Sequence, residues 1–278
     1  DLNGQASPRV LELAYINSFF ETGLKSPLDE AILNHETVDV SGWKKIDEIP
    51  FDFERRCVSV LVDNGTQRWL VAKGAAEDIS RLCTHVEAHV DGHLDKREVD
   101  DTTLQHICAQ YHALESDGLR VLGVAWREVS RDQATAVVND ESALTLAGFA
   151  AFLDPPKESA APALAKIQSA GVKIKVVTGD SDLVTRHVCD QLHIEVTGVL
   201  TGKEIEKLDD QALQRRVETA NLFCRVNPGQ KQRVILALKA NGHVVGYMGD
   251  GINDAPSLHA ADVGLSVDSA VDVAKAAA

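Results

Sequence analysis

The second half of the chain carries the pattern that most restricts its fold. From about residue 144, short apolar segments alternate with segments that have the periodicity or the start residues of helices. We expect strands at 173–177, 221–224 and 244–248, and helices at 182–192 and 229–240. This βαβ alternation is typical of a parallel sheet flanked by helices, where catalytic groups lie just past the carboxyl ends of the strands. Residues 144–278 are therefore expected to form an α/β domain.

The first half has a different pattern of predicted strands and helices. The β-rich runs 57–62 and 68–73 flank Asn64-Gly65, which is a hairpin signature, and a further strand is expected at 120–126. Helical periodicity or helix-start residues occur at 8–21, 27–35 and 103–117. Because 278 residues exceed one average domain, we expect two, with residues 1–143 forming an α+β domain on an antiparallel sheet.

Charge and composition exclude several classes of protein. With 42 acidic against 28 basic residues, the chain repels nucleic acid and anionic membrane surfaces on average. The five cysteines form no Cys-x-x-Cys pair. The longest apolar runs, 144–153 and 244–248, fall short of the roughly 20 residues of a membrane-spanning helix. The start lacks signal-peptide features and 271–278 is a helix without a cap, so we expect both ends to be cut points in a longer chain.

A candidate magnesium site follows the strand at 244–248. The string Tyr247-Met-Gly-Asp-Gly-Ile-Asn-Asp-Ala-Pro256 has glycines that let the backbone turn sharply and bring Asp250 and Asp254 together. Carboxylate oxygens suit Mg²⁺, and Asn253 would orient water or phosphate oxygens. A surface turn rich in Gly, Asp and Asn is the alternative interpretation. The whole string at a strand end favours the metal site.

Two further strand ends carry groups that suit phosphate. The strand at 173–177 ends in Thr178-Gly179-Asp180 before a helix expected near 182, where backbone donors and the helix dipole favour anions. Asp180 taken alone is equally suited to cap that helix. The strand at 221–224 leads into a helix begun by proline that carries Lys231, a cation that would neutralise phosphoryl charge. A lysine there is otherwise an ordinary surface residue.

In this order, Thr178-Gly-Asp180, Lys231 and Gly249-Asp-Gly-Ile-Asn-Asp-Ala-Pro256 resemble the phosphorylation domain of P-type cation-transporting ATPases, a Rossmann-like haloacid dehalogenase fold. Asp154-Pro-Pro-Lys157 resembles the hinge motif of that family. Pro50-Phe-Asp-Phe-Glu-Arg-Arg56 and Lys73-Gly-Ala75 are similar to motifs of its nucleotide-binding domain. The resemblance covers essentially the whole chain. It implies a nucleotide-binding domain over 1–143 and the C-terminal part of the phosphorylation domain over 144–278.

The resemblance implies ATP and Mg²⁺ as cofactors. It implies that Phe51 stacks on adenine, that Lys73 lines the nucleotide pocket and that Arg120 reaches the phosphates, roles that suit an aromatic face and two cations. Phe51 taken alone is more often a core residue, and only the nearby cations favour a base platform. Further residues assigned to the nucleotide site are Asp29, Arg55, Gly74 and Asp154. The catalytic set is Thr178, Gly179, Asp180, Lys231, Asn253 and Asp254, with metal ligands Asp250 and Asp254.

The family's nucleophile is missing from this sequence. In the family it lies in an Asp-Lys-Thr-Gly-Thr string on the first strand of the phosphorylation domain, before the nucleotide-binding insertion, and no such string occurs here. We therefore expect the sheet to be incomplete, with its first, central strand missing, and the chain alone to bind ATP without turning it over. Its expected partners are ATP and the transmembrane and actuator domains of the same parent chain.

The transported ion is indicated only by resemblance. The segments 49–56 and 262–274 are similar to those of bacterial magnesium-importing P-type ATPases. The implied parent is a multi-pass inner-membrane protein with this part on the cytoplasmic face, coupling ATP hydrolysis through an aspartyl phosphate to transport of a cation, magnesium by this similarity. The Mg²⁺ expected at Asp250 is a cofactor and says nothing about the cargo.

Three other interpretations fit parts of the sequence. Asp180-Ser-Asp182 spells the nucleophile motif of a stand-alone haloacid dehalogenase phosphatase, but Thr178-Gly179 separate it from the strand and the first 150 residues would have no purpose. In a second interpretation the chain only binds nucleotide, which differs from the main interpretation in scope and not in the site. His85, His89 and His93 would suit zinc if helical, but Asp91-Gly92 predicts a hairpin turn and hence exposed histidines.

Overall fold

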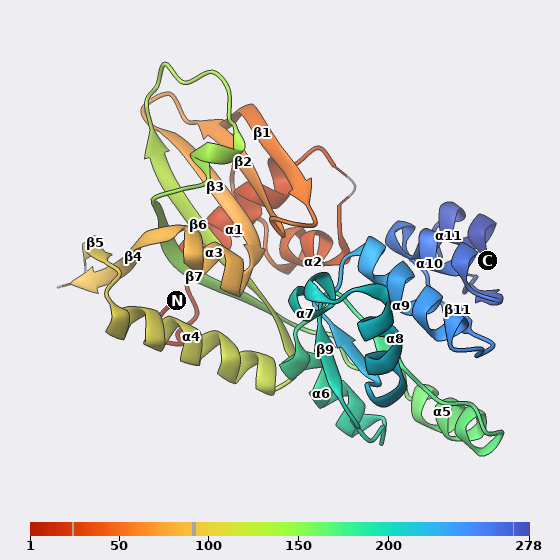
Figure 1. Ribbon diagram of the computed structural model, residues 1–278. Helices are drawn as coiled ribbons and strands as arrows, with labels where there is room; N and C mark the ends of the chain where they lie inside the picture. The colour runs from red at the N-terminus through yellow and green to blue at the C-terminus, as the bar shows by residue number, and fades with distance from the viewer. Residues whose placement is uncertain (24, 91–92, 269) are drawn as a thin grey trace. The chain divides into compact units, whose positions relative to one another are not determined.

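A seven-stranded sheet organises the first of two compact units, Asp1–Asp154 and Pro155–Ala278 (Figure 1). The computed structural model describes residues 1–23, 25–90, 93–268 and 270–278. The strand order is β1-β2-β3-β6-β7-β4-β5, with β4 and β7 parallel and the other neighbours antiparallel. The strands are β1 Lys44–Asp52, β2 Cys57–Asp63, β3 Arg68–Ala75, β4 Cys83–Val90, β5 His93–Glu98, β6 Leu119–Val129 and β7 Leu144–Leu153.

Helices cover both faces of this sheet. They are α1 Pro8–Phe20, α2 Pro27–His35, α3 Ala76–Leu82 and α4 Asp101–Ser116, with a 3₁₀ turn, η1, at Val138–Asp140. Ser7 caps α1 by accepting a hydrogen bond from the Val10 amide, and Ser26 forms a capping box with Asp29 at α2. The α1 residues pack with Val60, Val71 and Val124 on one face. Ile79 of α3 and Ile107 of α4 pack with Leu144 on the other.

The three tryptophans of the chain gather in the first unit. Trp69 lies between Trp43, at 4.4 Å between ring centroids, and Trp126, at 4.9 Å. Arg9 of α1 lies over the Trp69 ring at 4.5 Å from its centroid. Tryptophan emission therefore reports on the packing of α1 against the sheet.

The second unit holds two small parallel sheets. One has the order β8-β10-β9 and the other pairs β11 with β12. The strands are β8 Val176–Val177, β9 Val199–Thr201, β10 Leu222–Cys224, β11 Gly246–Met248 and β12 Val263–Leu265. The helices are α5 Ala160–Ser169, α6 Asp182–Gln191, α7 Gly202–Lys207, α8 Asp210–Thr219, α9 Pro228–Ala240, the 3₁₀ turn η2 Ile252–Asp254, α10 Ala255–Ala260 and α11 Asp272–Ala277. Phe223 and Val234, both fully buried, lie in its main core.

Several predicted elements are confirmed. The Asn64-Gly65 hairpin forms between β2 and β3, with Gly65 at φ +88° and the Asn64 side chain accepting from the Thr66 and Gln67 amides. The helix predicted at 27–35 has the bounds of α2. β4 and β5 pair antiparallel, as a hairpin requires, while Asp91-Gly92 lies outside the described residues. His85 lies in strand β4 and not in a helix.

Other expectations need correction. The predicted division at 143/144 falls at 154/155, because β7 pairs with β6 and β4 inside the first sheet. That sheet is not purely antiparallel, since β4 and β7 run parallel. The strands expected at 173–177 and 244–248 shorten to β8 and β11. None of the helices in the described ranges is long and apolar enough to cross a bilayer.

Candidate functional site

Two exposed aromatic side chains mark the end of β1. Phe51 lies on the strand and is 49% exposed, and Phe53 lies in the turn to β2 and is 44% exposed. Their ring centroids are 5.1 Å apart with an interplanar angle of 90°, an edge-to-face arrangement. Phe51 is therefore a surface residue, as a base platform requires, and not the core residue that composition alone would favour.

Arg55 braces the turn that carries these rings. Its guanidinium donates to the Pro50 carbonyl at 2.5 Å and to Glu141 Oε2 at 2.5 Å. Glu141 is 4% exposed and also accepts from the Ser59 hydroxyl at 2.7 Å. The resemblance assigned Arg55 to the nucleotide site. In the structure its guanidinium binds Glu141 and the Pro50 carbonyl.

Lys73 and Asp29 form a buried ion pair next to α1. Both residues are 4% exposed, and the Lys73 ammonium donates to Asp29 Oδ1 and to Ser18 Oγ, the latter at 2.6 Å. Burial acts to raise the pKa of Asp29, but the adjacent Lys73 charge and the hydrogen bonds from Lys73 and Ser26 outweigh it, so the pKa is lowered. The resemblance assigned both Lys73 and Asp29 to the nucleotide site, and in the structure the two side chains are in direct contact.

Glu21 lies beside the Lys73–Asp29 pair, and the sequence did not predict it as a site residue. It follows the last residue of α1, is 9% exposed, and its Oε2 atom lies 4.0 Å from Lys73 Nζ. Within the described part of the chain, Oε2 has no hydrogen-bond partner. Burial, and then the charge of Asp29, raise the pKa of Glu21. An acidic residue after a helix gives no sequence signal of this inward orientation.

Gly74 permits a close approach of two backbones. A Cβ at Gly74 would lie 2.4 Å from the Arg56 carbonyl oxygen and 2.6 Å from Cys57 Cβ. Arg56 has a left-handed backbone at φ +55°, and its carbonyl accepts from the Ala75 amide at 3.0 Å. Glycine at 74 thus lets the β1–β2 turn rest on the end of β3.

Arg120, near the start of β6, pairs with Asp154, just after the end of β7, at the same end of the sheet as the β1–β2 turn. Arg120 Nη1 lies 3.3 Å from Asp154 Oδ2, and both side chains are partly exposed, at 37% and 62%. Lys73 pairs with Val124 of β6, four residues from Arg120, which corresponds to about 13 Å along a strand. The structure therefore joins Arg120 to Asp154 and places Lys73 farther along the same sheet.

In the second unit, Asp254 connects Lys231 with Tyr247. Asp254 Oδ1 accepts from Lys231 Nζ at 2.8 Å and from the Tyr247 hydroxyl at 2.8 Å, and Oδ2 accepts from the Gly251 amide at 3.2 Å. Burial acts to raise the pKa of Asp254, but Lys231 and the other donors lower it overall. Burial and the bond to Asp254 raise the pKa of Tyr247. Tyr247 begins the string that predicted the magnesium site, but the sequence predicted no role for its side chain.

The fit of a magnesium ion differs between the two predicted ligands. The Asp254 oxygens already accept three hydrogen bonds, whereas Asp250 is exposed at the end of β11 beside exposed Asn253. Mg²⁺ is often held by one or two carboxylates with water and phosphate oxygens. No group of three or more His, Cys, Asp or Glu with metal-binding placement occurs in the described ranges. Asp250 fits such a single-carboxylate site better than Asp254.

The Thr178 loop follows β8. The Thr178 hydroxyl donates to Asp180 Oδ2 at 3.0 Å, and the Asp180 amide donates to Thr178 Oγ1 at 3.0 Å. The Arg225 amide, after β10, donates to the Asp180 carbonyl at 2.9 Å. The cap of α6 is Ser181 and not Asp180, because its hydroxyl accepts from the Val184 amide. Gly179 is exposed beside these groups.

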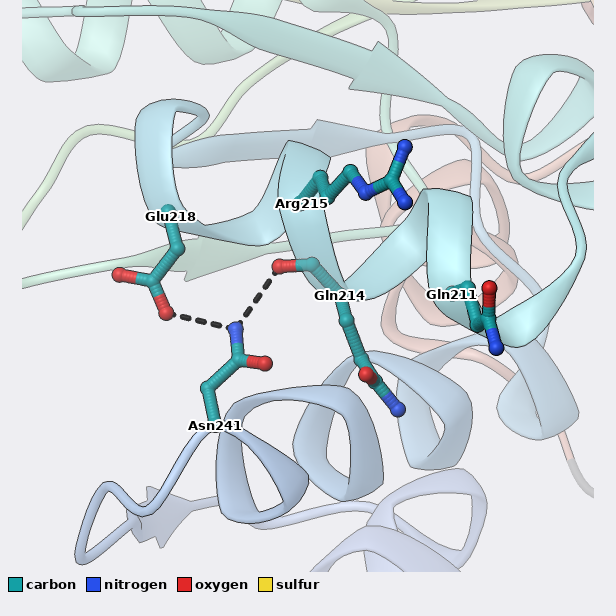
Figure 2. A pocket seen from close by; sticks show the side chains of 5 residues that line it. All are labelled: Gln211, Gln214, Arg215, Glu218 and Asn241. Carbon is teal, nitrogen blue, oxygen red and sulfur yellow. Dashed lines mark hydrogen bonds between the residues drawn. The ribbon is translucent and has the colours of Figure 1, made fainter.

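A polar surface pocket of about 520 Å³ lies elsewhere in the second unit (Figure 2). The Asn241 side chain donates to Glu218 Oε1 at 2.6 Å and to the Gln214 carbonyl at 2.8 Å. The other lining residues are Gln211 and Arg215. None of the sequence-predicted site residues lines this pocket, so its volume does not bear on their chemistry.

Comparisons with known proteins cover the whole chain. Residues 4–159 match the family model described as P-type ATPase, cytoplasmic domain N. A magnesium-transporting ATPase, P-type 1, of Salmonella typhimurium strain LT2 is 45% identical over 286 residues, and one of Escherichia coli K12 is 44% identical over 284. A calcium-transporting ATPase 1 of Lactococcus lactis is 31% identical over 83% of this chain and 26% of its own length. The alignments span 100% of this chain and 31% of the length of each magnesium-transporting relative.

Proposed function

The chain belongs to the P-type ATPase family, and on that premise we propose that it is the ATP-binding and phosphorylation part of a cation transporter. The parent enzyme would transfer the γ-phosphoryl group of ATP to an aspartate carried outside this chain. The bond from the γ-phosphorus to the bridging oxygen breaks, ADP leaves with that oxygen, and an aspartyl phosphate forms. Hydrolysis of that intermediate would be coupled to ion movement.

The first unit is proposed to hold the nucleotide. The observation that carries this assignment is the exposed, aromatic Phe51 at the end of β1, next to a braced turn, in a region that the family model covers. Its ring offers a stacking surface to adenine. Lys73 and Arg120 supply cations on the same sheet, and each is held by a carboxylate, Asp29 and Asp154 respectively. ATP would approach these cations from the Phe51 side.

The second unit is proposed to be an incomplete Rossmann-like haloacid dehalogenase domain. Both of its sheets are parallel, and the Thr178 and Asp250 loops follow the carboxyl ends of β8 and β11. Among the described strands, β8 pairs with β10 and β11 pairs with β12. Exposed apolar side chains lie just before β11 and at its last residue, with Val244 at 84% and Met248 at 65% exposure. A strand joining β8 to β11 would unite the two sheets and cover such side chains.

All of the catalytic residues except Asp180 have a task in this proposal. Lys231, oriented by Asp254, would neutralise charge on the transferred phosphoryl group, and the Thr178 hydroxyl and Gly179 amide would donate hydrogen bonds to its oxygens. Asp250 would hold Mg²⁺, which when bound supplies charge neutralisation at the phosphate. Asn253 would orient water near Asp250. Asp254 serves in this proposal to orient the lysine and not to bind metal.

Magnesium is the proposed cargo. The relatives at 44% and 45% identity are named magnesium-transporting, whereas the calcium-transporting relative is 31% identical. By the same comparison, the chain is proposed to lie on the cytoplasmic face of a membrane with the transmembrane and actuator domains of its parent as partners. The phosphatase interpretation has no comparable support, since a stand-alone phosphatase leaves residues 4–159 unexplained.

Calorimetry of ATP binding tests the proposal, with magnesium present and absent and with phosphate release assayed in parallel. The wild-type chain is expected to bind ATP without releasing phosphate. Loss of a base-stacking aromatic typically costs about 1–3 kcal/mol, so Phe51→Ala is expected to weaken binding by about fivefold or more. Lys73→Ala serves as a second variant. Steady phosphate release that Asp180→Asn abolishes would instead support the phosphatase.

A further inference from the structure

The Phe51–Phe53 pair is exposed although both side chains are large and apolar. Each ring is exposed by more than two-fifths, at 49% and 44%, and the two are in mutual contact at 5.1 Å. Neither belongs to the buried clusters of the described residues in the first unit. Adjacent exposed apolar side chains are characteristic of a binding surface. Core packing therefore does not account for the orientation of these rings.

The backbone around the pair is held by a set of local hydrogen bonds. The Asp52 carboxylate accepts from the Glu54 and Arg55 amides, each at 2.9 Å, and the Asp52 carbonyl accepts from the Arg56 amide at 2.7 Å. The Arg55 side chain adds its bond to the Pro50 carbonyl. Phe51 at the end of β1 and Phe53 in the turn thus project from a fixed backbone, and the contact between the two rings helps to orient them.

Resting on the nucleotide site proposed above, we infer that Phe53 is a positioning residue for the base of the nucleotide. In a perpendicular pair, the edge of one ring meets a face of the other, so Phe53 covers at most one face of Phe51. Phe53 limits rotation of the Phe51 ring and leaves the other face for stacking. A purine that stacks there meets a ring already oriented for it, which lowers the entropic cost of binding.

Two ligands and four variants test this role. Calorimetry compares ATP with inorganic tripolyphosphate, which lacks a base, on the wild-type chain and on Phe53→Ala, Phe53→Tyr, Phe51→Ala and the Phe51→Ala/Phe53→Ala double variant. Phe53→Ala is expected to weaken ATP binding by about threefold to tenfold, the value of an aromatic pair, and to leave tripolyphosphate unchanged. Phe53→Tyr retains the ring and is expected to bind ATP as the wild type does. The double variant is expected to bind no more weakly than Phe51→Ala.

The controls separate this inference from the nucleotide site itself. Phe53→Leu keeps apolar bulk without a ring and is expected to match Phe53→Ala, and tryptophan emission verifies that the first unit remains folded. If Phe51→Ala weakens ATP binding while Phe53→Ala does not, or if Phe53→Ala weakens both ligands equally, the positioning role is wrong and the nucleotide site stands. If Phe51→Ala leaves ATP binding unchanged, the nucleotide site and the positioning role both fail.

Discussion

Lys73 and Asp29 form an ion pair in which each residue is only 4% exposed, at the junction of β3, α1 and α2. Both residues belong to the proposed nucleotide site, and both are also buried in the interior of the first unit. Any nucleotide that contacts the Lys73 ammonium competes with Asp29 and with the Ser18 hydroxyl. Variants at Lys73 thus change stability as well as binding, and both must be measured.

Breaking this pair is expected to destabilise the first unit more than replacing both partners. Lys73→Met leaves Asp29 buried without its cation, and loss of one partner of a buried pair typically costs about 3–5 kcal/mol. Urea unfolding followed by tryptophan emission measures the loss. Lys73→Met combined with Asp29→Asn is expected to be less destabilising than Lys73→Met alone, and so also less than the sum of the single variants. Additive losses would show that the two residues are not coupled.

The stability of the first unit is expected to respond to pH through Glu21. The pKa of Glu21 is raised in the folded state, by burial first. A carboxyl of this kind contributes stability below its unfolded pKa and loses it as pH rises through the folded pKa. Glu21→Gln, which stays neutral, is therefore expected to stabilise the unit near pH 7 and to have little effect below about pH 4. Thermal unfolding across this range measures the difference.

Asp29→Asn is the control, because its effect on stability near pH 7 is expected to be opposite to that of Glu21→Gln. The pKa of Asp29 is lowered in the folded state, chiefly by Lys73 acting against burial. Its contribution is present above the unfolded pKa and is lost as pH falls through the folded pKa. Asp29→Asn should hence destabilise the unit near pH 7 and progressively less in acid. Parallel pH profiles for the Glu21 and Asp29 variants would contradict the assignment of the two carboxyls.

Gly74→Ala is expected to destabilise the end of β3 strongly. The added Cβ would lie 2.4 Å from the Arg56 carbonyl oxygen, a backbone atom that cannot move without opening the turn. Overpacking of this kind costs about 1–3 kcal/mol or more. Gly42→Ala is the matched control, since nothing lies within 4 Å of a Cβ built there. Equal unfolding midpoints for the two variants would refute the close approach.

Tyr247→Phe is expected to weaken the support of Lys231 without unfolding the second unit. It removes one of the two donors to Asp254 Oδ1, a hydrogen bond to a charged group that contributes about 1.5–3 kcal/mol. The pKa of Asp254 should rise relative to the wild type, because one interaction that lowers it is lost. Carboxyl NMR titration follows that pKa directly. An unchanged Asp254 titration would show that Tyr247 does not act on this carboxylate.

Local signals in the sequence predicted the elements that depend on local interactions. Asn64-Gly65 predicted a hairpin because its backbone conformation is set within the turn, and Ser26-Pro27 predicted the start of α2 through capping. The Gly-Asp-Gly string predicted the turn after β11. A Cβ at Gly249 would lie 2.5 Å from Asp254 Cβ, so that turn depends on glycine.

Features that depend on long-range contacts could not be predicted from local signals. The strand β7 reads like the start of the second half, yet its partners β6 and β4 belong to the first sheet. β1 was not predicted, because its pairing with β2 is interrupted by register shifts and many of its residues are polar. The side-chain direction of Arg55, and the inward orientation of Glu21, depend on distant partners such as Glu141 and Lys73, which the local sequence does not reveal.

Photolabelling with an adenine-azido analogue of ATP tests whether the base binds at Phe51, because the azide marks residues that lie beside the base. Labelled peptides are identified by mass spectrometry, with excess ATP as competitor and Phe51→Ala as the matched variant. We expect ATP-sensitive labelling within β1, β2 or the turn between them, and its loss in Phe51→Ala. Labelling confined to residues 155–278, or labelling that ATP does not compete, would contradict it.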